Sequence, residues 1–148
     1  MVIFTSNEER ELPAAFLRRC IYYHLELPPF RDEVRGEGKP VVSIEDIVAR
    51  CVGQRYAQHD ALLREALQLF RFLRGLPKHR SLEKPPALAE LLDWLRLLSH
   101  QLPSGQAGLA QHPEFDASLM ALLKHKGDRE RWSEQLQEEF DTWRQGQA

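Results

Sequence analysis

The stretch LEKPPALAELLDWLRLL, residues 82–98, decides the fold class of this 148-residue chain. Its leucines recur at the three- and four-residue spacing that places side chains on one face of a helix: Leu88, Leu91, Leu92, Leu95 and Leu98. Pro85 and Pro86 precede the first of them, where proline is compatible with a helix start, and Pro103 bars continuation. The stretch therefore predicts an amphipathic helix that packs against other helices.

Helical patterns continue on both sides of this stretch. Ser43 followed by Asp46 is a capping-box variant, and it opens a pattern with the apolar stripe Ile44, Ile47, Val48 and Cys51. A second pattern ends near Gly75 and contains Leu63, Ala66, Leu67, Phe70 and Leu73. Two more follow the quoted stretch: Phe115, Leu119, Leu122 and Leu123, then Trp132, Leu136, Phe140 and Trp143. Residues 43–148 are therefore expected to form four or five helices around a shared core. The aromatic side chains of the last pattern fit that core better than a partner contact.

The N-terminal segment VIFTSNEERELPAAFLRRC, residues 2–20, follows a different pattern. Its first three residues form the continuous apolar run of a strand covered on both faces, and Pro13 begins a short helix. IYYHLEL, residues 21–27, alternates with period two and predicts a second strand. Residues 30–40 are charged, contain two glycines and predict a loop or a frayed helix, within a linker over residues 29–42. Two strands alone do not make a stable parallel sheet, so this α/β piece is expected to be incomplete.

Composition narrows the function classes. The chain has 43% hydrophobic residues, 28% charged residues and a net charge of −2. It therefore has no excess of basic residues to hold a phosphate backbone, which disfavours the hypothesis of a helical nucleic-acid binder. No apolar run has the length of a membrane span, and no secretory signal is visible. Two cysteines, Cys20 and Cys51, form no disulfide framework or metal spacing, and neither do the six histidines. We expect a cytoplasmic protein without a metal site.

Three segments, taken in chain order, resemble the second half of an AAA+ ATPase core, most closely its MoxR-type branch. They are a strand ending in T-S-N followed by E-L-P-x-A-F-L-R-R-C, then LEKPPALAELLDWLRLL, then LLKHKGDRERW at residues 122–132. The resemblance covers nearly the whole chain. It implies a mostly α chain in which the incomplete C-terminal strands of an α/β core (1–28) and a linker (29–42) precede an α-helical lid bundle (43–148).

The resemblance also implies catalytic and nucleotide-binding residues. Asn7 stands at the sensor-1 position, where its amide would orient the attacking water. The arginine finger, which serves a neighbouring subunit, matches Arg19 best. Arg18 and Cys20 replace the acidic and aromatic residues usual around the finger, so Arg18 and Arg19 both stay candidates. Lys84 would replace the sensor-2 arginine as a point charge near the phosphates.

Each of these residues also fits a simpler role. Asn7 could end a strand and cap the next helix, and Arg18 and Arg19 could complement the dipole at a helix C-terminus. Lys84 could be a solvated lysine before a proline-initiated helix.

The 148 residues contain no G-x-x-x-x-G-K-[ST] loop and no Walker-B strand ending in D-E. They therefore lack the usual phosphate cradle and magnesium ligand, which the resemblance places N-terminal to Val2. We expect the C-terminal part of a larger ATPase that couples ATP hydrolysis, with Mg²⁺, to chaperone-like remodelling or assembly of a client complex. This chain alone is expected to hydrolyse no ATP.

The resemblance implies partners as well. The complete protein would form a homo-oligomeric ring, a hexamer by the family pattern, and such relatives often work with a von Willebrand factor A domain protein. The alternative of another class is a non-enzymatic helical interaction protein that docks on an ATPase ring.

Overall fold

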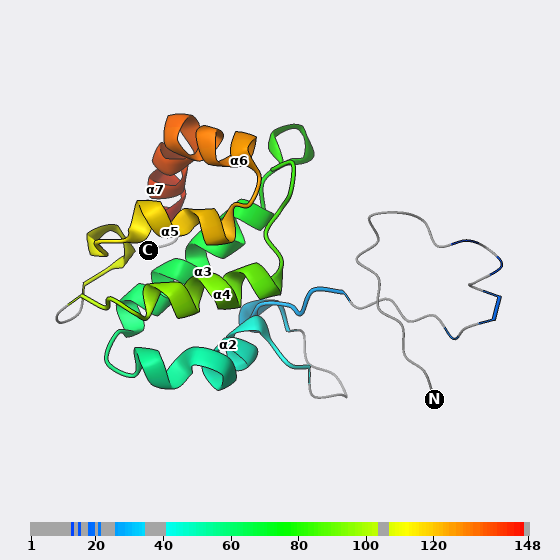
Figure 1. Ribbon diagram of the computed structural model, residues 1–148, viewed down its shortest axis with the longest axis horizontal. Coiled ribbons are helices and arrows are strands. Elements are labelled where there is room, and N and C mark those ends of the chain that lie inside the picture. Colours follow the sequence, from blue (N-terminus) through cyan, green and yellow to red (C-terminus); the bar gives the residue numbers. More distant parts are fainter. Residues whose placement is uncertain are drawn as a thin grey trace.

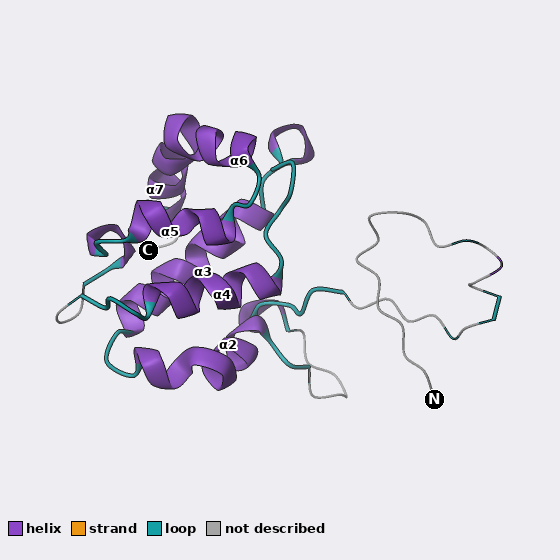
Figure 2. Ribbon diagram, viewed as in Figure 1, coloured by secondary structure: helices purple, strands orange, loops and turns teal. Residues whose placement is uncertain are grey.

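The computed structural model describes residues 26–34, 41–103 and 107–146, together with Pro13, Ala15, Arg18, Arg19 and Ile21. Within these residues the protein is mostly helical and has no β-strand, as Figure 2 shows. The helices are α2 (Ile44–Val52), α3 (Asp60–Arg74), α4 (Leu88–Leu98), α5 (Phe115–Leu122), α6 (Lys126–Arg131) and α7 (Gln137–Gln145) (Figure 1). A mostly helical fold is confirmed for the described part of the chain.

Helix α4, predicted from the quoted stretch, lies at the centre of the bundle. It packs against α5, α2 and α3, while α3 also contacts α7 (Figure 1). None of the helices in the described ranges combines the length and apolar character that crossing a membrane requires.

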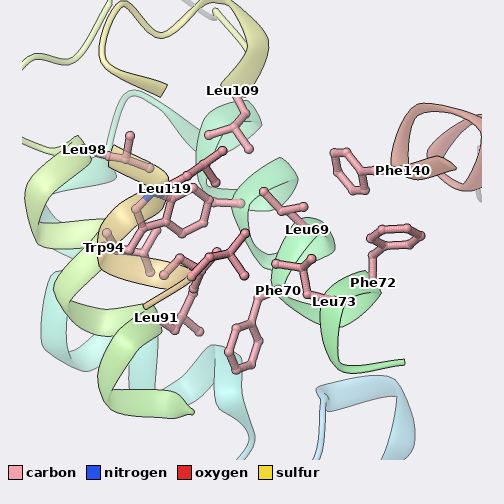
Figure 3. Packing of buried hydrophobic residues seen from close by; sticks show 14 of the residues in the cluster. Leu69, Phe70, Phe72, Leu73, Leu91, Trp94, Leu98, Leu109, Leu119 and Phe140 are labelled. Atoms are coloured by element: carbon pink, nitrogen blue, oxygen red, sulfur yellow. The ribbon is translucent and has the colours of Figure 1, made fainter. Parts of the chain in front are cut away.

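The core includes the space between α3 and α4. Figure 3 shows Leu69, Phe70 and Leu73 of α3 facing the side of α4 that carries Leu91 and Trp94. All five side chains are at most 1% exposed, and each contributes about 1.5–3 kcal/mol by leaving water. The apolar face of α4 is therefore wider than its leucine stripe, because it includes the tryptophan.

Trp94 joins α4 to α5 by a polar contact inside this core. Its indole Nε1 donates to Ser118 Oγ at 2.7 Å, and the Ser118 hydroxyl donates onward to the carbonyl of Phe115. Both side chains are buried, so the hydrogen bond satisfies groups that water does not reach.

The capping box before α2 is confirmed. The Asp46 backbone N–H donates to Ser43 Oγ at 3.2 Å, and the Ser43 backbone N–H donates to the Asp46 carboxylate at 3.1 Å. The expected place of Cys51 in the buried stripe is wrong, since its side chain is exposed. Helix α2 instead turns Ile44, Val48 and Val52 inward, at the four-residue spacing of one helical face.

The last predicted helix is a continuous helical run from α6 to α7, with a π-helical turn at Trp132–Leu136 between them. Trp132, Leu136 and Phe140 are buried, so the core position expected for Trp132 and Phe140 is confirmed. Trp143 is partly buried and packs against this core. On the other side of α3, Phe72 faces Phe140 (Figure 3), with 5.5 Å between the ring centroids. The Phe72 ring centroid also lies 5.8 Å from that of Trp143.

Residues 29–34, the first part of the expected linker, lie on the helices. Phe30 is 7% exposed and belongs to the core, with its ring centroid 6.3 Å from that of Phe70. The backbone N–H of Ile44 donates to the carbonyl of Pro29 at 2.9 Å, which ties this segment to the start of α2. This part of the chain is thus continuous with the helical bundle.

The two expected strands fall largely outside the described residues. Of the second one, the structure describes Ile21, Glu26 and Leu27, and none of these three is in a strand. The α/β core expected over residues 1–28 therefore stays a prediction.

Candidate functional site

Residues 81–86, here called the lysine loop, lead into α4 and carry Lys84. The loop is held by Asp128 of α6, which lies more than forty residues further along the chain. The Asp128 carboxylate is 0% exposed and accepts the backbone N–H of Glu83 at 2.9 Å and that of Lys84 at 3.1 Å. Each carboxylate oxygen thus receives one backbone donor.

Arg131 holds the same segment from the same helix. Its guanidinium donates to the carbonyl of Arg80 at 2.7 Å and to that of Ser81 at 3.0 Å. Asp128 and Arg131 are three residues apart, which places them on one face of α6. Together they make four hydrogen bonds to the backbone of residues 80–84, here called the α6–loop junction.

The junction fixes the backbone of Lys84 and leaves its side chain exposed. Pro85 and Pro86 follow with a restricted φ, and Arg74 donates to the carbonyl of Pro86 at 2.7 Å. Lys124 pairs with Glu90 and Lys126 pairs with Glu130, whereas no carboxylate among the described residues pairs with Lys84. Lys84 therefore presents a positive charge from a held position beside the start of α4.

Glu90, in the first turn of α4, does not suit general acid catalysis. Burial acts to raise the pKa of its carboxyl group, but hydrogen bonds from Lys124 and from backbone N–H groups outweigh this and lower that pKa below its usual value. Glu90 is thus ionised at neutral pH, when it pairs with Lys124 and accepts the Ala87 N–H at 3.2 Å. Its role is to cap α4 and to link it to the end of α5.

The structure places the predicted site residues unevenly. Asn7 lies outside the described residues. Arg18 and Arg19 lie in a turn and are exposed, and no contact given by the described residues joins either of them to Lys84. What the structure brings together is the segment around Lys84 and the segment around Asp128, the second and third of the segments that carry the resemblance.

Sequence reasoning did not single out Asp128 or Arg131. Both lie in KGDRER, whose charges are typical of a solvated helical face. The only signal available was that this segment is part of the resemblance as a whole. The burial of Asp128 depends on the contact with the lysine loop, and the local sequence pattern does not encode this contact.

A second candidate region is an open groove of about 600 Å³ beside α7. It is lined by Phe72, Arg80, Glu134, Gln135, Glu138, Glu139, Thr142 and Trp143. Three of these residues are acidic, and the one arginine among the lining residues pairs with Glu139. Like charges repel, so this groove does not suit the phosphates of a nucleotide.

Comparisons of the chain with protein-family models, with curated proteins and with solved structures gave no match. Function is therefore inferred from the resemblance of the three segments and from the geometry of the lysine loop.

Proposed function

We propose that this chain is the C-terminal part of a MoxR-like AAA+ ATPase. The complete protein would couple ATP binding and hydrolysis to chaperone-like remodelling or assembly of a client complex. The α6–loop junction is the observation that supports this proposal. It unites two segments that independently resemble the same lid, and it does so around the residue expected to meet a phosphate.

Lys84 fits its proposed role, because a phosphate contact needs an accessible cation held in a defined place. Asn7 would orient the attacking water, and Arg19 or Arg18 would act on a nucleotide bound by the neighbouring subunit. The described residues contain no group of acidic and histidine side chains suited to a metal ion. By the resemblance, Mg²⁺ would be held with ATP by the Walker motifs of the complete protein.

The proposed assembly follows from the resemblance. A finger that acts on a neighbour requires contact between subunits, and the family pattern for this contact is a homo-oligomeric ring, a hexamer. A von Willebrand factor A domain protein is the proposed partner, and the cytoplasm is the proposed location.

The proposal is tested on the protein purified from its own cells through a tag added to the chromosomal gene. We expect the purified material to hydrolyse MgATP, and we expect Arg19→Ala to abolish turnover while leaving the assembly intact. Arg18→Ala in a parallel strain identifies which arginine is the finger. The 148-residue chain produced alone is the control and is expected to show no turnover, because its sequence lacks the phosphate cradle. Purified material of 17.2 kDa without ATPase activity would refute the proposal.

A non-enzymatic interaction protein is the second candidate. It is favoured by the core that the described helices enclose among themselves, since a bundle of this kind is able to fold without an ATPase core. This candidate predicts that the isolated chain changes the ATPase rate of a ring with which it associates. An unchanged rate over a wide molar excess of the chain would exclude it.

A further inference from the structure

We propose that Asp128 is a positioning residue that sets the place from which Lys84 reaches a phosphate, and that residues 83–87 offer this phosphate the Lys84 ammonium group but no free backbone N–H. The inference deepens the proposed function and rests on it for the identity of the ligand. The hydrogen bonds that carry it belong to this chain and are testable without a nucleotide.

The first step is the burial of the Asp128 carboxylate. A carboxylate without access to water is costly unless its oxygens are well hydrogen-bonded. Asp128 is 0% exposed, and its two oxygens accept the N–H groups of Glu83 and Lys84. Charge-assisted hydrogen bonds of this kind are about twice as strong as neutral ones. The burial of Asp128 therefore favours one conformation of the loop over others.

The second step concerns the backbone donors that precede α4. Free N–H groups just before a helix commonly bind anions such as phosphate. Here the N–H groups of Glu83 and Lys84 are already bonded to Asp128, while Pro85 and Pro86 have none. The next N–H, that of Ala87, donates to Glu90. From residue 83 to residue 87 every backbone donor is thus occupied or missing, so over these five residues a phosphate would find the side chain of Lys84 and no free backbone N–H.

The place of the Lys84 backbone bears on the rate of ATP hydrolysis. A lysine is a point charge on a flexible stem, so the place of its backbone decides where the ammonium group is concentrated. Asp128 holds Lys84 from one side, and the two prolines restrict the chain on the other. Displacement of a catalytic charge by about 1 Å lowers the rate by about 10²-fold. Releasing the loop from Asp128 should therefore cost much of what removing Lys84 costs.

The loop itself is tested in the isolated 148-residue chain with Asp128→Asn. Asparagine keeps the size of the side chain but replaces one acceptor oxygen with an NH₂ donor, which faces a backbone N–H. We expect the Glu83 and Lys84 amides to exchange hydrogen at least tenfold faster, with exchange in α3 unchanged. Asp116→Asn is the matched control, because Asp116 is exposed in the first turn of α5. Unchanged exchange at both loop amides would overturn the positioning role.

The phosphate contact is tested by a double-mutant cycle in the tagged protein from its own cells, with kcat and KM for MgATP as readouts. Lys84→Ala and Asp128→Asn are each expected to lower kcat/KM by about ten- to one hundred-fold, as a misplaced charge does. If Asp128 acts through Lys84, the double variant is no worse than Lys84→Ala alone within twofold. A purely structural role predicts that the two losses multiply, and that result would refute the proposal.

Two further outcomes are distinguished by design. If the Asp128→Asn variant does not fold, Arg131→Gln is used in its place, because Arg131 holds the backbone carbonyls of the same loop. Arg129→Gln is the control for Arg131→Gln. Arg129 lies on the same helix but binds the carbonyls of Leu123 and Lys124. If the unmodified protein shows no ATPase activity, the proposed function and the phosphate role of Lys84 both fail. The hydrogen-exchange result then decides whether Asp128 holds the loop.

Discussion

The substitution Phe30→Ala tests whether residues 29–34 pack against the helical bundle. We expect Phe30→Ala to destabilise the protein strongly, although a charged stretch followed by glycines predicts a linker at this point of the sequence. The ring is 7% exposed and packs near Phe70, and the guanidinium carbon of Arg71 lies 4.9 Å from its centroid.

The magnitude follows from these contacts. Replacing a buried phenylalanine with alanine costs about 3–5 kcal/mol, which includes the cavity that it leaves. Phe30 lies at the edge of the core, where the structure relaxes more easily, so the lower end of that range applies. Loss of the cation–π contact with Arg71 is expected within this total, since such contacts contribute about 0.5–1 kcal/mol at accessible sites. We therefore expect a loss of about 3 kcal/mol, a large part of the roughly 5–15 kcal/mol typical of a domain.

The assay is equilibrium unfolding in urea, followed by tryptophan fluorescence. The midpoint should fall while the slope m stays constant, because the change affects stability and not the surface exposed on unfolding. Val42→Ala is the control, since Val42 is 58% exposed and substitutions at such positions change stability by less than about 0.5 kcal/mol. A loss below about 1 kcal/mol for Phe30→Ala would show that the segment does not pack on the helices in solution.

Three other predictions concern the hydrogen bond of Trp94, the pKa of Asp46 and the hydroxyl group of Tyr56. Ser118→Ala leaves the buried Trp94 N–H without its acceptor and should cost about 1–3 kcal/mol in urea unfolding, and a neutral effect would contradict that bond. Hydrogen bonds from the Ser43 hydroxyl and backbone, followed by Arg31, lower the pKa of Asp46 to about 2. This folded-state pKa lies below the ordinary value of 3.8, so the ionised Asp46 stabilises the folded state fully above pH 3.8, and this stabilisation is lost as the pH falls through 2. An NMR titration of the Asp46 carboxyl group with a midpoint near 3.8 would refute the lowered pKa. Tyr56→Phe removes a buried hydroxyl that donates to a carbonyl of α4, and it should lower the free energy of unfolding by about 1 kcal/mol. Burial raises the pKa of Tyr56, so the ultraviolet titration of this tyrosine should begin above the usual pH range.

Local sequence signals predicted the helices well. Helix α4 begins just after Pro85 and Pro86 and ends before Pro103, and α2 begins at a capping box whose two partners are three residues apart. Such signals act within one turn of backbone, so they do not depend on the rest of the fold.

The sequence was less informative about which face of a helix points to the core. The stripe expected on α2 included Cys51, but the helix turns Val52 inward. Both residues are apolar, and neighbouring stripes on a helix differ by a rotation of about 100° per residue. The rotation is decided by the surface of α4, against which α2 packs.

At the candidate site, too, local sequence signals and tertiary contacts determined different features. The sequence by itself determined that Lys84 stands before a proline-initiated helix, and that its segment and residues 122–132 resemble parts of one lid. Only the tertiary structure decided that Asp128 is buried and that it accepts the Lys84 N–H. A charged residue within a charged helix is by default solvated, and its burial requires donors from a distant segment. Contacts of this range arise from packing of whole helices, which no local pattern of residues specifies.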